Sequence, residues 1–147
     1  MAYDGVIDTD LAYTAGIIDG EGNIGIYANM SRKHNPVLKL RVRVNSTDEW
    51  LVHWLKQTYG GSVGYADLGT RLGKNWKPVW WWTISCRKAL LFIEAVLPYL
   101  RMKKPQAEIA IRFQQRHYRG HQMKDAEYAI AEAESILIKQ LNKRGIR

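Results

Sequence analysis

The segment from Leu38 to Asn45 alternates strictly between apolar and polar side chains, and this alternation limits the folds open to the chain. The two sets interleave without exception: Leu38, Leu40, Val42 and Val44 against Lys39, Arg41, Arg43 and Asn45. A period of two places each set on its own face of a β-strand, so the strand belongs to a sheet with one buried and one basic face. Three like charges about 7 Å apart repel one another, which favours nucleic acid over the alternative of a bare solvated face.

The overall charge supports a polyanionic partner. The chain has 22 Lys and Arg against 14 Asp and Glu, a net charge of +8 in 147 residues. Residues 1–31 contain no Lys or Arg, which argues against a signal peptide or an Arg-rich transit peptide. We therefore expect a protein that is not secreted, located in the cytoplasm of a prokaryote or phage-infected cell, or in the matrix or stroma if organelle-encoded. A single cysteine, Cys86, excludes an intramolecular disulfide, and the sequence has no apolar run long enough to span a membrane.

Turn residues and apolar spacing predict an α+β domain in which helices and strand pairs alternate. Strands are expected at 23–31, 36–45, 62–70 and 78–85, and helices at 9–19, from 50 to the stop at Gly60 and Gly61, and at 88–99, 106–118 and 125–144. Asp8, Thr9 or Asp10 is expected to cap the first helix, and residues 46–49 resemble a capping box for the second. A basic loop, 71–77, joins the last two strands. An apolar stripe is expected on the last helix, formed by Ala126, Ile130, Ala133, Leu137 and Leu141.

Two groups of side chains leave alternatives open. Alternation places Trp80, Trp82 and Ile84 in the core, and puts Trp81 on the opposite face, against either nucleic acid or a neighbouring strand. Towards the C-terminus a solvated basic surface is the favoured interpretation and DNA contact the alternative, for Arg112, Arg116, His117, Arg119 and Lys124.

The first helix carries small residues at every fourth position. Ala12, Gly16 and Gly20 share one face, and side chains of this size let a second helix approach closely. The second helix could belong to the same subunit or to another copy. Glu21 follows directly, at a helix–strand junction beside the basic sheet. A carboxylate there is suited to Mg²⁺, which binds oxygen ligands and bridges naturally to phosphate.

The segment from Thr14 to Gly22, TAGIIDGEG, resembles the nine-residue signature of the LAGLIDADG homing endonucleases. Thr14 replaces the first Leu of the signature, and Glu21 replaces the last Asp. Two further passages resemble the family's later blocks, namely the strand–helix passage around 45–48 and the passage 97–106. The resemblance covers about residues 8–118.

The resemblance implies the αββαββα homing-endonuclease fold, in which a saddle-shaped antiparallel sheet lies in the DNA major groove. Residues 1–118 would form the endonuclease core, and 119–147 a helical extension packed on the same domain. Carried over by position, Glu21 is the metal-binding acid and the Gly20 carbonyl a further ligand. Lys103 matches the active-site lysine, and Ser46 or Asn45 falls where relatives position a water. The metal would be Mg²⁺, with Mn²⁺ able to substitute and Ca²⁺ binding without efficient cleavage.

The same resemblance nominates DNA contacts on the outward face of the sheet and in the loop between its last strands. They are Tyr27, Asn29, Ser31, Lys39, Arg41, Arg43, Tyr65, Asp67, Trp81 and Thr83 on the sheet, and Arg71, Lys74 and Lys77 in the loop. Arg suits guanine and Asn suits adenine, whereas Lys more often meets phosphate.

The signature occurs once, so one chain supplies one acid and half a saddle. We therefore expect an intron-type homing endonuclease that acts as a homodimer, with Ala12, Gly16 and Gly20 at the subunit contact. Such a dimer would hydrolyse double-stranded DNA at a pseudo-palindromic site and leave 3′ overhangs. The alternative functions are an RNA maturase that assists intron splicing and a non-cleaving DNA-binding protein on the same scaffold.

Overall fold

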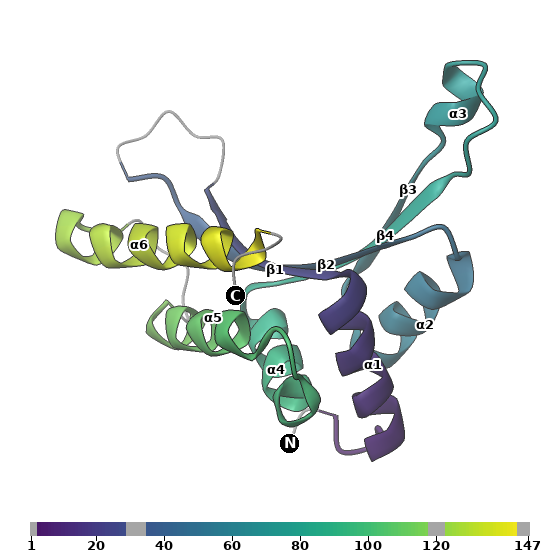
Figure 1. Ribbon diagram of the computed structural model, residues 1–147. Coiled ribbons are helices and arrows are strands. Elements are labelled where there is room, and N and C mark those ends of the chain that lie inside the picture. The colour runs from purple at the N-terminus through teal and green to yellow at the C-terminus, as the bar shows by residue number, and fades with distance from the viewer. Residues whose placement is uncertain (1–2, 29–34, 118–122, 144–147) are drawn as a thin grey trace.

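A four-stranded antiparallel sheet organises the molecule, which is described here from a computed structural model covering residues 3–28, 35–117 and 123–143. The strand order is β1-β2-β4-β3 (Figure 1). The strands are β1 (Gly22–Ala28), β2 (Leu38–Ser46), β3 (Ser62–Ala66) and β4 (Val79–Ser85). The helices are α1 (Asp8–Glu21), α2 (Glu49–Tyr59), α3 (Leu68–Arg71), α4 (Cys86–Val96), α5 (Lys104–Arg116) and α6 (Asp125–Asn142), with a 3₁₀ turn at Leu97–Tyr99. This order confirms the predicted α+β class and the αββαββα arrangement. Within the described residues no helix is long and apolar enough to cross a membrane.

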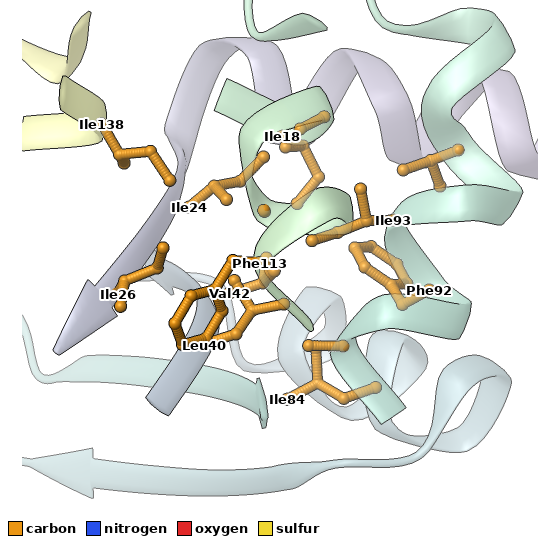
Figure 2. Close-up of a cluster of buried hydrophobic side chains, with 14 of the residues drawn as sticks. Ile18, Ile24, Ile26, Leu40, Val42, Ile84, Phe92, Ile93, Phe113 and Ile138 are labelled. Carbon is orange, nitrogen blue, oxygen red and sulfur yellow. The ribbon is translucent and has the colours of Figure 1, made fainter. Parts of the chain in front are cut away.

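The apolar face of the sheet forms the centre of the core, as the alternation in β2 predicts. Val42 lies opposite Ile24 on one side and Ile84 on the other, and all three are buried. Helices α1, α4 and α5 cover this face with side chains such as Ile18, Phe92 and Phe113 (Figure 2). Each such side chain contributes about 1.5–3 kcal/mol when fully buried. The indole N–H of the buried Trp82 donates to the Gly60 carbonyl at 2.7 Å, so the largest core side chain leaves no unpaired donor.

The predicted caps of the first two helices are both wrong in detail. Helix α1 begins at Asp8 with Ile7 at the N-cap and no side-chain cap, so its first-turn acids stabilise the helix through its dipole and not as caps. Asp48 rather than Ser46 or Thr47 caps α2, because its carboxylate accepts from the Trp50 N–H at 2.9 Å. Gly60 and Gly61 end α2 with φ of 85° and 88°, as expected for residues without a Cβ.

The second hairpin is an arm that projects from the body of the molecule, with α3 at its tip (Figure 1). The strand predicted for 62–70 ends at Ala66, because the Asp67 carboxylate folds the next residues into a single helical turn. It accepts from the Thr70 N–H at 3.0 Å and from the Thr70 hydroxyl at 2.7 Å. A local side-chain hydrogen bond thus competes successfully with continuation of the strand.

Helix α6 lies against β1, but the apolar stripe predicted for it is wrong. Ile130 and Leu137 are 57% and 44% exposed, whereas Ala131, Ser135 and Ile138 are buried. The reason is that β1 is an edge strand whose outer carbonyls need donors. The Ser135 hydroxyl donates to the Ile26 carbonyl at 2.7 Å, and the Asn142 amide donates to the Ile24 carbonyl at 2.9 Å.

His117 is a second correction near the C-terminus. The sequence favours a solvated basic side chain here, yet only 6% of His117 is exposed. Its ring lies 4.8 Å from that of Phe113, and its Nδ1 is 3.2 Å from a Glu127 carboxylate oxygen. The histidine therefore helps to join α5 to α6, while Arg119 lies outside the described residues.

Two isoleucines on α6, one buried and one exposed, provide a matched test of how the helix packs. Ile138→Ala removes a fully buried side chain and is expected to cost about 2–5 kcal/mol of unfolding free energy. Ile136→Ala, at a position that is 49% exposed, should change it by less than about 0.5 kcal/mol. Urea denaturation of the two variants measures both values. Equal effects would mean that α6 does not dock on β1 through the face described.

Candidate functional site

The segment that resembles the family signature forms the C-terminal half of α1 and the first residue of β1. Thr14, which replaces the first Leu of the signature, is fully buried. Its hydroxyl donates to the Asp10 carbonyl at 2.8 Å and lies 2.7 Å from the Tyr59 hydroxyl of α2. The polar side chain is thus satisfied within the core, and the substitution leaves α1 as a regular helix.

The small-residue face of α1, which we define as Ala12, Gly16 and Gly20, points away from the protomer. All three residues are exposed, and a Cβ added at either glycine would meet no atom within 4 Å. Packing against a helix of the same subunit, the alternative left open by the sequence, is therefore wrong for the described residues. Each glycine costs an isolated helix about 1 kcal/mol relative to alanine, and the fold of the protomer gives no reason for that cost.

A clasp of hydrogen bonds ties the end of α1 to the segment before α5. The Asp19 carboxylate accepts from the backbone N–H groups of Arg101, Met102 and Lys103, at 2.8, 3.1 and 3.0 Å. In the opposite direction, Lys103 Nζ donates to the carbonyls of Ile18, Asp19 and Gly22, at 2.9, 3.1 and 2.7 Å. An ammonium at the C-terminal carbonyls of a helix also opposes the helix dipole favourably.

This geometry bears on the role of Lys103. An ammonium has three donors, and all three point to carbonyl oxygens in this arrangement. Burial lowers the pKa of Lys103, and the negative charges of Asp19 and Glu21 oppose that shift. We infer that Lys103 acts first as a positioning residue, which holds the backbone on both sides of Glu21.

Removal of the Asp19 charge should loosen the clasp. Asp19→Asn weakens three charge-assisted hydrogen bonds and is expected to cost about 1–3 kcal/mol of unfolding free energy. Thermal or urea denaturation measures the loss, with Glu94→Gln, an exposed acid on α4, as the matched control. A cost no larger than that of the control would show that the carboxylate does not secure the 101–103 backbone.

Glu21 is the exposed acid that the sequence singled out, and it occupies the last position of α1. A carboxylate there faces the negative end of the helix dipole, so it is not placed for the stability of the helix. Its carboxylate and the Gly20 carbonyl are hard oxygen donors of the kind that Mg²⁺ binds. Two such ligands do not complete an octahedral shell, and among the described residues no group of three or more His, Cys, Asp or Glu side chains could hold a metal. The remaining ligands would have to come from water, nucleic acid or a second copy of the chain.

Of the two candidates for a water-positioning residue, only Asn45 faces the basic side of the sheet. Its side-chain oxygen accepts from Arg43 Nε at 3.1 Å. Ser46 lies on the opposite face, opposite Trp80, and its hydroxyl accepts from the Asp48 N–H at 2.9 Å. Ser46 thus has a structural partner at the start of α2.

The basic face of the sheet is the side opposite the helices. Strand register brings onto it six of the predicted contacts, together with Asn45 and with Asn23, Ser62 and Ser85, which the sequence analysis missed. The six are Tyr27, Lys39, Arg41, Arg43, Trp81 and Thr83. Asn23 alternates in phase with Tyr27, so the period-two rule already contained the signal for it.

Other predicted contacts lie elsewhere. Placing Tyr65 on the outward face is wrong: it lies opposite Trp80 on the other face, with ring centroids 4.5 Å apart. Tyr65 is two residues after Val63, so the period-two rule places both on the same face, and Val63 lies opposite the buried Trp82. Arg71, Lys74 and Lys77 are exposed on the arm, where Asp67 caps α3. Asn29 and Ser31 fall outside the described residues.

Comparison with known proteins identifies the fold. Neither protein-family models nor curated protein sequences give a match to this chain. Among solved structures it is similar to the homing endonuclease I-CvuI in complex with its target in the presence of Ca, with a TM-score of 0.72 and 17% identity over 95% of this chain and 85% of that one. The archaeal intron-encoded homing endonuclease I-Vdi141I, complexed with DNA, gives 0.75 and 14% over 95% and 88%. The LAGLIDADG meganuclease I-AabMI, bound to uncleaved DNA, gives 0.60 and 19% over 90% and 44%. The chain therefore has the fold of the LAGLIDADG homing endonucleases, whose signature its Thr14–Gly22 segment resembles.

Proposed function

We propose that the chain is one subunit of a homodimeric, site-specific endonuclease that hydrolyses both strands of double-stranded DNA. The observation that carries the proposal is the exposed Glu21, located between the bare small-residue face of α1 and the first strand of the basic face. The fold supports it, because similar solved structures include homing endonucleases in complex with DNA.

A dimer follows from the count of acids in the signature. One chain supplies one Glu21, and two phosphodiester bonds must be cut. A two-fold pairing of the small-residue faces would bring two copies of Glu21 to the centre and join two basic faces into one surface. Because the two halves of such an enzyme are identical, its target should be close to a palindrome.

Different residues of the chain would have different roles in the reaction. Glu21 and the Gly20 carbonyl would hold a divalent ion, with Mg²⁺ the expected one and Mn²⁺ a substitute. When bound, that ion would supply Lewis acidity at the phosphate and a hydroxide at neutral pH. Lys103 and Asp19 fix the backbone that carries Glu21. Of the two candidates from the sequence, Asn45, held by Arg43, is the one on the basic face and could orient a water beside the sheet.

The experiment that tests the proposal is cleavage of a randomised pool of DNA duplexes. With Mg²⁺ the protein should cut a subset that shares a pseudo-palindromic sequence, and sequencing of the ends should reveal 3′ overhangs. With Ca²⁺ it should bind the same subset without efficient cutting. Binding of duplexes without cleavage in any divalent metal would favour a non-cleaving DNA-binding protein, and preference for structured intron RNA would favour a maturase.

A further inference from the structure

Two arginines on the basic face lie on aromatic rings contributed by the neighbouring strands. Arg41 Cζ is 4.2 Å from the centroid of the Tyr27 ring on β1, and Arg43 Cζ is 4.8 Å from that of Trp81 on β4. Each aromatic residue is the diagonal neighbour of its arginine in the sheet, two positions from the residue directly opposite. The strand pairing therefore builds the same stack twice, on the two sides of β2.

A glycine lies beneath each ring and makes the stack possible. Gly25 is directly opposite Arg41, and Gly64 is directly opposite Trp81. A Cβ at Gly25 would overlap the Tyr27 ring, and one at Gly64 would overlap the Trp81 ring, closer than real Cβ contacts allow. Each ring thus lies over the backbone of a glycine. Any other residue at Gly25 or Gly64 would carry a Cβ in the space that the ring occupies.

Hydrogen bonds hold one part of each stack in place. The Tyr27 hydroxyl donates to the Asn23 side-chain oxygen at 2.6 Å, which fixes the ring along β1 over Gly25. Arg43 Nε donates to Asn45 at 3.1 Å, which fixes the plane of that guanidinium. Arg41 Nε is buried and has no hydrogen-bond partner among the residues that the structure describes. The Arg43 guanidinium is therefore held by a hydrogen bond, and the Arg41 guanidinium is confined by its buried Nε and by the fixed Tyr27 ring, so less rotamer entropy is lost when they bind.

The geometry points to Arg41 and Arg43 as base-reading residues that recognise two guanines in each half of the DNA target. This inference rests on the proposed function. A planar guanidinium with a fixed orientation matches the O6 and N7 acceptors of guanine in the major groove. Arginine also pairs bidentately with phosphate, and the arginine-to-lysine variants described below distinguish the two contacts. The aromatic platforms explain why the sheet carries arginine rather than lysine at these two positions.

The register also gives the spacing and order of the two guanines. Residues two apart on a strand are about 6.7 Å apart, and successive bases rise about 3.4 Å, so the two guanines should be about two base steps apart. Arg43 lies opposite Asn23, two residues after Glu21, and Arg41 lies opposite Gly25, two residues further on. The guanine read by Arg43 is therefore the one nearer the cleaved bond.

Selection of bound duplexes from a randomised pool tests the inference without cleavage. Performed in Ca²⁺ and again with no divalent ion, it should yield a guanine at both positions in each half-site for the unaltered protein. Tyr27→Leu should lose the preference only at the outer position, and Trp81→Leu only at the inner one. A bidentate contact discriminates by about 1–3 kcal/mol, so the preference lost should be roughly 5- to 150-fold. Trp50→Leu, an exposed tryptophan on α2, is the matched control and should leave both preferences unchanged.

Substitutions of the arginines separate base reading from phosphate contact. If Arg41→Lys and Arg43→Lys bind all sequences more weakly but keep both base preferences, the arginines contact phosphate and the inference is overturned. A protein that cuts duplexes with Mg²⁺ but shows no platform-dependent guanine preference would overturn the inference alone. A protein that selects the guanines yet never cuts would overturn the nuclease proposal alone. Circular dichroism of each variant identifies any loss that comes from misfolding.

Discussion

Glu21→Gln is expected to lower DNA cleavage about a thousandfold or more, because loss of the ligand charge removes several kcal/mol of metal-dependent stabilisation of the transition state. The substitution keeps the size of the side chain and replaces one acceptor oxygen by an NH₂ donor. Glu21 is exposed at the end of α1, so the free energy of unfolding should change by less than about 0.5 kcal/mol. Single-turnover cleavage of a selected duplex in Mg²⁺ measures the loss.

The control for this variant is Glu94→Gln, which neutralises an exposed acid on α4, outside the signature segment. It should cut like the unaltered protein. Both variants should bind the duplex in Ca²⁺ with affinities within a fewfold of the unaltered protein. Cleavage by Glu21→Gln within tenfold of normal would mean that another group supplies the essential ligand.

Gly16→Leu is expected to convert the dimer into monomers and to abolish coordinated cutting of both strands. The side chain would project from the small-residue face of α1, where a Cβ meets nothing within 4 Å in the protomer. The folded protomer should therefore tolerate it, whereas a second α1 could no longer approach. Analytical ultracentrifugation should show half the mass, and supercoiled plasmid should no longer be linearised.

Gly16→Ala distinguishes an effect on the folded protomer from an effect on the dimer, because the two are expected to have opposite signs. Alanine should stabilise the isolated helix by up to about 1 kcal/mol, and it should weaken the dimer. Gln57→Leu, at an exposed position of α2, controls for the added apolar side chain of the leucine variant. A Gly16→Leu protein that remains dimeric and fully active would show that the subunits meet elsewhere.

The pattern of β2 determined most of the architecture, because a period of two assigns every side chain to a face before any partner is known. The burial of Leu40, Val42 and Val44, and the position of Arg41 and Arg43 on the opposite face, follow from it. The same rule did not extend to α6. Most of its predicted apolar stripe faces outward, since the helix docks through another face, where Ala131 and Ile138 are buried and Ser135 and Asn142 donate to carbonyls of the edge strand β1.

The sequence by itself determined the type of fold, the acid at Glu21 and the small-residue face of α1, because each depends on short spacings within one element. Only the tertiary structure decided what lies beside these residues. It assigned the three donors of Lys103 to the backbone around Glu21, and it placed Tyr27 and Trp81 beneath the arginines of β2. These contacts join residues from separate segments, and their geometry depends on strand register and glycine clearance. Local periodicity specifies neither of these.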